Sequence, residues 1–185
     1  MKKIFPIFCL FISISAFGQI TSEKTWPISV QKEIDFLKSQ KIDTVLVSYT
    51  YLGPWNDLPN ACQDIDDIWI IYHKDKYFAK RIFCNSDSTT SEFSISAKPI
   101  RFFVKHISDF KTRDTYFKTH NTLPPYQTDV FSDHLIFMTN NKSIAINISD
   151  YQKVDSIWGK FPWIKPSIEA IDLTKTTIQS GRQKK

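Results

Sequence analysis

The sequence predicts an α+β fold, with an antiparallel sheet of about five to six strands and three helices packed mainly on one face. Short segments in which apolar and polar residues alternate, bounded by turn residues, are typical of strands. Three longer segments instead carry apolar residues at helical spacing. Short turns, rather than crossover helices, join most of the strands, and this favours antiparallel neighbours.

Helical spacing occurs over about residues 30–40, 100–110 and 167–179. In each segment the apolar side chains recur so that they share one face of a helix. Pro99 suits the first turn of the second helix, because the N–H that proline lacks has no intrahelical partner there. Threonines in the third segment lower its helix propensity. The residues on the three apolar faces are Val30, Ile34 and Leu37; Ile100, Phe103, Val104, Ile107 and Phe110; and Ile168, Ile171 and Ile178.

Strands are expected at residues 44–52 and 92–96 and in two hairpins. The first hairpin covers about residues 67–84 and turns at Lys74-Asp75-Lys76. The second covers residues 134–148 and turns at Asn140-Asn141, where asparagine can adopt the positive φ of a two-residue hairpin turn.

The register of the second hairpin follows from its turn. Pairing Thr139 with Lys142 sets Phe137 opposite Ile144, and Leu135 opposite Ile146. These apolar side chains then form the core face of the hairpin. The opposite face, expected to be half solvated, carries His134, Met138, Ser143 and Asn147.

The first 18 residues have the features of a bacterial-type secretory signal. Lys2 and Lys3 precede an apolar run that is shorter than the roughly 20 residues of a membrane-spanning helix, and small residues mark a cleavage site after Gly18. We therefore expect a secreted or periplasmic protein with no integral membrane segment after cleavage. Removal of residues 1–18 from the 185 leaves 167, which suit a single domain over 19–180 and a disordered basic tail over 181–185.

The charge of the mature body gives no reason to expect a nucleic-acid partner. The full chain carries 24 Lys and Arg residues and 19 Asp and Glu residues. Five of the basic residues lie in the signal or the tail, so 19 remain against 19 acidic ones. A surface without net positive charge lacks the electrostatic attraction that phosphate backbones require.

Two cysteines, Cys62 and Cys84, remain after the signal is removed. In an oxidising compartment such a pair is expected to form a disulfide, here across the first predicted hairpin. The redox alternative needs a Cys-x-x-Cys motif, which the chain lacks, and a structural zinc site needs four ligands at short spacings.

The sequence lacks the motifs of several kinds of binding and catalytic site. The mature chain has only the glycines Gly53, Gly159 and Gly181, so no glycine-rich loop can cradle a phosphate, and we expect no cofactor. The consecutive residues Ser132, Asp133 and His134 have the letters of a catalytic triad, but sequence neighbours cannot adopt its geometry. The histidines, which show no metal-binding spacing and are expected at the surface or at sheet edges, are His73, His106, His120 and His134.

Carboxylates crowd together at Asp64, Asp66 and Asp67, before a predicted strand. Such a cluster could raise the pKa of one carboxyl group, and with a histidine brought near by folding it would support a small hydrolase. The cluster could also bind a calcium ion, but the glycine and the distal glutamate of a calcium loop are missing. The simpler interpretation is a solvated loop that leads into the strand.

Three segments combine prolines with large aromatic residues: 51–62, 119–126 and 158–166. Rings held by stiff loops lose little entropy on binding, which makes them suitable contact groups. The alternative is that the rings fold down and cap the sheet. In preference to an enzyme, we predict a binding or interaction module for an unknown protein or extracellular ligand. Its expected contact residues are Trp55, Tyr51, Leu58, Trp158 and Trp163.

Overall fold

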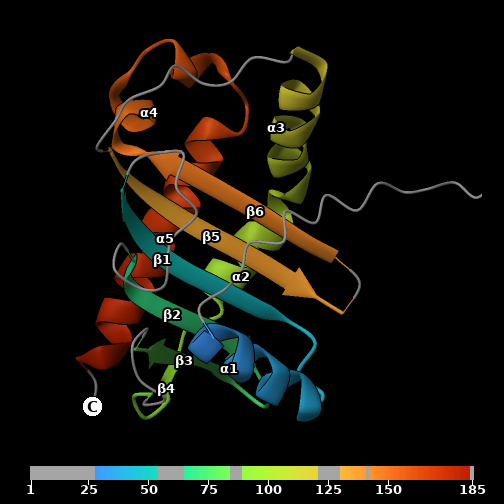
Figure 1. Ribbon diagram of the computed structural model, residues 1–185, viewed down its shortest axis with the longest axis vertical. Coiled ribbons are helices and arrows are strands. Elements are labelled where there is room, and N and C mark those ends of the chain that lie inside the picture. The colour runs from blue at the N-terminus through green and yellow to red at the C-terminus, as the bar shows by residue number, and fades with distance from the viewer. Residues whose placement is uncertain (1–27, 54–64, 84–88, 121–129, 141, 184–185) are drawn as a thin grey trace, which may run out of the picture.

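The computed structural model describes residues 28–53, 65–83, 89–120, 130–140 and 142–183, and in these ranges it confirms the predicted α+β fold (Figure 1). Six antiparallel strands form one sheet in the order β4-β3-β2-β1-β5-β6. The strands are β1 (Val45–Gly53), β2 (Ile65–His73), β3 (Tyr77–Ile82), β4 (Phe93–Ile95), β5 (Val130–Thr139) and β6 (Lys142–Ser149). The helices are α1 (Ile28–Ser39), α2 (Lys98–Lys105), α3 (Ile107–His120), α4 (Asp150–Val154), the 3₁₀-helix η1 (Trp158–Lys160) and α5 (Ile164–Arg182).

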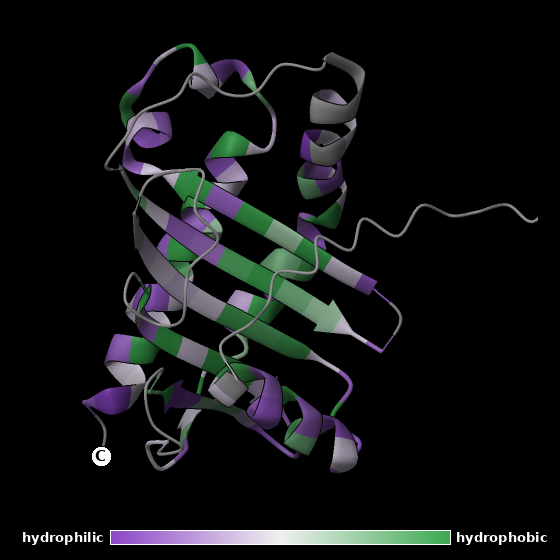
Figure 2. Cartoon of the chain, viewed as in Figure 1, coloured by the Kyte–Doolittle hydropathy of each residue, from purple (hydrophilic) through white to green (hydrophobic). Residues whose placement is uncertain are grey.

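Both predicted hairpins are present. β2 and β3 flank the turn Lys74–Lys76, and Ile68 pairs with Ile82. In the second hairpin Thr139 pairs with Lys142, and the predicted pairing of the isoleucines of β6 with Phe137 and Leu135 is confirmed. In Figure 2 hydrophobic and hydrophilic residues alternate along much of β6, whereas β5 carries a hydrophilic stretch followed by a hydrophobic one.

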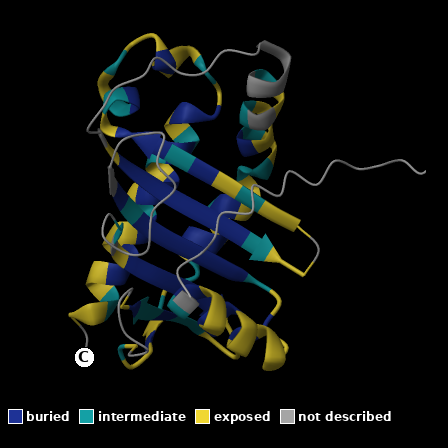
Figure 3. Cartoon of the chain, viewed as in Figure 1, coloured by how far each residue is buried: buried dark blue, intermediate teal, exposed yellow. Residues whose placement is uncertain are grey.

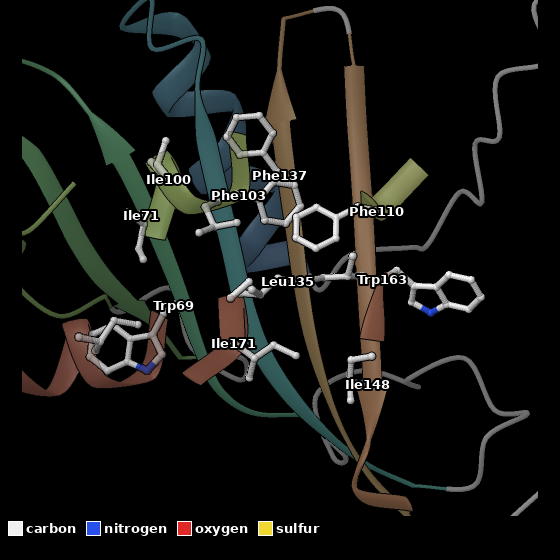
Figure 4. Close-up of a cluster of buried hydrophobic side chains, with 14 of the residues drawn as sticks. Trp69, Ile71, Ile100, Phe103, Phe110, Leu135, Phe137, Ile148, Trp163 and Ile171 are labelled. Atoms are coloured by element: carbon white, nitrogen blue, oxygen red, sulfur yellow. The ribbon is translucent and has the colours of Figure 1, made fainter. Parts of the chain in front are cut away.

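The back face of the sheet carries the larger hydrophobic core. Side chains of the central strands, such as Leu46 and Leu135, meet residues from α2, α3, η1 and α5 there. The rings of Phe103, Phe110 and Phe137 lie together, with the Phe103 ring centroid 4.6 Å from that of Phe110 and 5.1 Å from that of Phe137 (Figure 4). Most described helices therefore pack on one face, as predicted.

A second core lies on the front face, which is turned toward the viewer in Figure 1. Here α1 buries Val30, Ile34 and Leu37, the three residues of its predicted apolar stripe, against β1 and β2. Its other side is exposed, whereas the central strands are buried (Figure 3). Helices thus lie on both faces of the sheet, and the described part of the chain has two α-helices and one 3₁₀-helix more than the three helices that the sequence predicted.

The second predicted helix is broken at His106. The backbone of His106 leaves the helical region (φ −104°, ψ 16°), and α3 starts at the next residue. The imidazole Nδ1 lies 2.8 Å from an Asp109 carboxylate oxygen in the first turn of α3. This break changes the direction of the chain, so that Phe103 and Phe110 can meet in one core although they belong to different helices.

The last helix extends beyond its predicted end near residue 179. α5 continues to Arg182, so the first two residues of the segment expected to be a disordered tail are helical. A Cβ atom added at Gly181 would lie 2.8 Å from the side chains of both Phe93 and Ile95, so the helix approaches β4 as closely as glycine allows. The Arg182 guanidinium lies 5.6 Å from the centroid of the Trp69 ring, which adds a cation–π contact.

Candidate functional site

Four strand ends meet at one end of the sheet, which we call the loop end. Gly53, the last residue of β1, pairs with Val130, the first residue of β5. Tyr51 pairs with Ile65, the first residue of β2. Ser149, the last residue of β6, pairs with a residue near the start of β5. The strands that flank segments 54–64 and 121–129, both of which contain proline and large aromatic residues, therefore begin or end side by side.

Exposed apolar side chains also gather toward the loop end. Phe131 is 55% exposed beside Val130. α4 follows directly after β6, and Val154 at its end and Ile157 just beyond it are 83% and 62% exposed. Phe83, which follows β3 as that strand approaches the same end, is 38% exposed. Two further large apolar side chains that are exposed in the described residues, Phe36 and Val104, lie on α1 and α2.

The third segment with proline and large aromatic residues folds into the core. Trp158 and Trp163 are only 6% and 2% exposed, and Tyr51 is 7% exposed, so these three predicted contact residues are not surface rings. Phe161 stacks on Trp163 with their centroids 4.6 Å apart, and the Tyr116 ring of α3 lies 5.4 Å from the Trp163 ring, which Figure 4 shows. The alternative that the rings cap the sheet holds for this segment. Trp55 and Leu58 lie outside the described residues.

The described part of the aspartate cluster is structural. Asp67 has a positive φ of 48°, at a point where the register between β1 and β2 shifts. Such a β-bulge needs a residue that tolerates the left-handed region, and aspartate does so better than most. The Asp67 carboxylate is exposed and forms an ion pair with Arg81 at 2.5 Å. Asp64 and the side chain of Asp66 lie outside the described structure, so the rest of this hypothesis stays a prediction.

Ser132 and His134 form a polar pair on the front face. The Ser132 Oγ lies 2.8 Å from Nε2 of His134, and both residues are buried. The imidazole stacks on the Tyr49 ring at 4.6 Å between centroids and meets the edge of Tyr51 at 6.3 Å. Burial raises the pKa of the Tyr49 hydroxyl well above its usual value. The prediction of a surface or edge position was wrong for His134, because aromatic residues of the neighbouring strand cover it.

Asp133 points to the opposite face, where it is the centre of an ionic cluster. Its two carboxylate oxygens accept hydrogen bonds from Lys175 of α5 at 2.6 Å and from Lys153 of α4 at 2.9 Å, and Thr50 donates at 2.7 Å. Burial alone would raise the pKa of Asp133, but these hydrogen bonds hold it below its usual value. Through these hydrogen bonds, α4 and α5 are both linked to β5 near the loop end.

The described residues do not assemble a triad from Ser132, Asp133 and His134. Ser132 and His134 are separated from Asp133 by the sheet itself, which confirms that these letters do not form a triad. Within the described ranges, no three His, Cys, Asp or Glu residues are grouped so that they could hold a metal ion. No described helix is both long and apolar enough to cross a membrane.

Other predictions concern parts of the chain that the structure does not describe. The positions of the predicted Cys62–Cys84 disulfide and of the predicted signal in residues 1–18 lie outside the described residues, so both stay predictions. The exposed residues at the loop end were missed by the sequence analysis, because a single valine or isoleucine outside a proline-rich segment carries no binding signal. Only their exposure in the folded chain identifies them.

Comparison with known proteins gave no match: no family model, curated protein or solved structure matches this chain.

Proposed function

We propose that this chain is a small secreted or periplasmic binding module that contacts a protein or extracellular ligand through the loop end of its sheet. The observation that carries the proposal is the exposure of Phe131, Val154 and Ile157 beside the strand ends. Apolar side chains grouped next to the same loops favour a contact surface, since isolated exposed apolar residues are scattered over most proteins.

The supporting framework is firm where the contact residues attach. Asp133, only 4% exposed, links β5 to both α4 and α5 through the two lysines. A capping box at Ser149 and Gln152 also fixes the start of α4 directly after β6. Contact side chains on such supported elements lose little conformational entropy when they bind, which increases affinity.

The matched pair of Phe131 and Phe36 tests this proposal. Their side chains are exposed to nearly the same degree, 55% and 54%, but Phe36 lies on α1, before the opposite end of β1. The immobilised chain would be used to capture binding partners from the medium and envelope fractions of the producing cells. We expect Phe131→Ser to lose the specific partner and Phe36→Ser to retain it, with both variants unfolding within about 0.5 kcal/mol of the unsubstituted chain.

Phe131→Ser and the double variant Val154→Glu/Ile157→Glu could both capture the same partner as well as the unsubstituted chain does. That result would refute contact at the loop end. The reverse pattern, in which only Phe36→Ser loses the partner, would move the binding surface to α1.

The alternative function, a small hydrolase built on the aspartate cluster, gains no support from the described residue of that cluster, Asp67. It requires a carboxyl group and an imidazole that converge at an accessible place. The described carboxylate of the aspartate cluster, that of Asp67, is paired with Arg81, and His134 is buried among aromatic rings.

A further inference from the structure

The two edge strands of the sheet, β4 and β6, are protected to different degrees against pairing with a strand of another chain. β4 has three residues, and α5 packs against it at Gly181. β6 has eight residues, which pair with β5 without any shift of register. Proteins usually protect exposed edges with short strands, bulges, prolines or charged residues. β6 contains no proline and no bulge, and its single charged residue, Lys142, stands at its start.

The backbone groups on the outer side of β6 can be identified from the hairpin. Thr139 and Lys142 flank a two-residue turn, so they form a hydrogen-bonded pair, and every second residue after Lys142 also bonds to β5. The residues between them direct their N–H and C=O groups outward: Ser143, Ala145 and Asn147. Ser149 follows the same alternation, because its N–H donates to the Gln152 side chain at 3.0 Å and not to β5.

In the described part of the chain, β5 is the only strand that pairs with β6. Ser143 and Ala145 are exposed, and Asn147 is half-buried. Arg113 of α3 donates a hydrogen bond to the side-chain oxygen of Asn147. That contact is made by the side chain of Asn147.

We propose that β6 pairs with β6 of a second copy of this chain, antiparallel, about a two-fold axis at Ala145. Ala145 then pairs with Ala145 of the second copy, and Ser143 pairs with Asn147. All three pairs join outward-directed residues, so each exchanges two N–H···O=C bonds, about six in total. In a register shifted by one residue, the outward-directed N–H and C=O groups of one copy would lie opposite residues of the other copy that bond to β5. Those pairs could not form the hydrogen bonds, whereas the register about Ala145 forms all of them.

The side chains on β6 are complementary to themselves in this register. On the back face Ile144 lies opposite Ile146 of the second copy, so that the apolar core continues across the junction. On the front face the opposed residues are small or uncharged. The charged residue Lys142 faces Ile148, so no like charges stand opposite one another.

α3 gives the added strand a surface to pack on. Its residues Ile107, Phe110 and Tyr116 pack in the back-face core, and the helix continues past the β6 edge of the sheet (Figure 1). A strand added to β6 therefore lies in front of α3. Such an interface is at the small end of specific interfaces, so we expect a weak dimer that forms at high concentration.

The dimer has a consequence for the loop ends. Because the two copies of β6 run antiparallel, the two loop ends point in opposite directions along the joined sheet. One dimer could therefore contact two partners at once, which gives an avidity that a single copy lacks.

Analytical ultracentrifugation of the exported chain over about 1 μM to about 1 mM tests the proposal, since this range covers weak interfaces. We expect a reversible shift from monomer to dimer. Ala145→Lys should abolish the dimer, because two lysines would stand opposite each other at the axis, and Ala145→Glu should do the same. A mixture of the two variants should form a heterodimer, because the opposite charges then pair.

Phe36→Ser is the matched control and should dimerise like the unsubstituted chain. A chain that stays monomeric at 1 mM, or a dimer that persists unchanged in Ala145→Lys, overturns the proposal. Unchanged circular dichroism spectra and melting temperatures of the Ala145 variants establish that loss of the dimer does not reflect misfolding. Two charge variants that fail to associate when mixed would also exclude a two-fold axis at Ala145.

Discussion

Ser132 and His134 are hydrogen-bonded to each other on the front face of the sheet, at 2.8 Å between Oγ and Nε2, whereas Asp133 between them is bonded to two lysines on the back face. The alternation of side chains along a strand causes this separation. Three consecutive residues thus belong to two different polar clusters, one on each face of the sheet. Both clusters are buried near the start of β5, the strand that begins at the loop end.

The Ser132–His134 pair is expected to contribute to stability. Ser132→Ala removes the hydroxyl partner of a buried ring nitrogen, which should lower the free energy of unfolding by about 1–3 kcal/mol. Urea denaturation measures this loss. Ser143→Ala, at an exposed serine on the front face of β6, is the control and should change the free energy by less than about 0.5 kcal/mol. Equal effects of the two substitutions would show that the buried hydrogen bond is energetically neutral.

The Asp133 cluster makes stability depend on pH in a defined direction. The pKa of Asp133 in the folded chain is lower than in the unfolded chain, so its contribution is complete above about pH 4 and is lost as the pH falls through the folded pKa. Asp133→Asn should therefore cost on the order of 2 kcal/mol at pH 7, and this difference should shrink below about pH 4.

Denaturant unfolding at several pH values between 7 and about 2.5 measures the Asp133 effect. Asp172→Asn, at an exposed position on α5, serves as the control. A difference between Asp133→Asn and the unsubstituted chain that stays constant over this range would show that charge is not the source of the stabilisation.

The two classes of tryptophan should respond differently to truncation. Trp163→Ala removes a core ring that is 2% exposed and should cost about 3–5 kcal/mol. If Trp55 is a contact residue of the loop end, Trp55→Ala should leave the melting temperature nearly unchanged and weaken capture of the partner. A stability loss for Trp55→Ala as large as that for Trp163→Ala would place Trp55 in the core and remove it from the binding surface.

Gly181 is expected to resist substitution although it lies in a helix. Alanine normally stabilises a helix by about 1 kcal/mol relative to glycine. At Gly181, however, the added methyl group would meet Phe93 and Ile95 at 2.8 Å, so Gly181→Ala should instead destabilise the chain by about 1 kcal/mol. Gly159 has no atom within 4 Å of the equivalent position, and Gly159→Ala should therefore be neutral or stabilising in thermal unfolding. A stabilising Gly181→Ala would mean that α5 does not hold this close approach to β4.

The sequence alone determined the elements whose periodicity is strong and local. The β5–β6 hairpin was predicted with its register, because the two-residue turn and the alternation of side chains allow only one pairing that buries Phe137 and Ile146 together. α1 was predicted with its buried stripe for the same reason, since Val30, Ile34 and Leu37 share one helical face. Each of these predictions depends on residues that are close in the chain.

The tertiary structure decided which side chains are covered. A strand has two faces, and the sequence does not say which elements pack on each, so the burial of His134 under Tyr49 and of Trp163 against Phe161 could not be predicted. The break at His106 likewise follows from packing two helices into one core. The loop end exists only through long-range strand pairing, which brings Gly53 beside Val130 across 77 positions of sequence. Exposure of Phe131 and Val154 at that end is a property of the assembled sheet, because it depends on what distant segments leave uncovered.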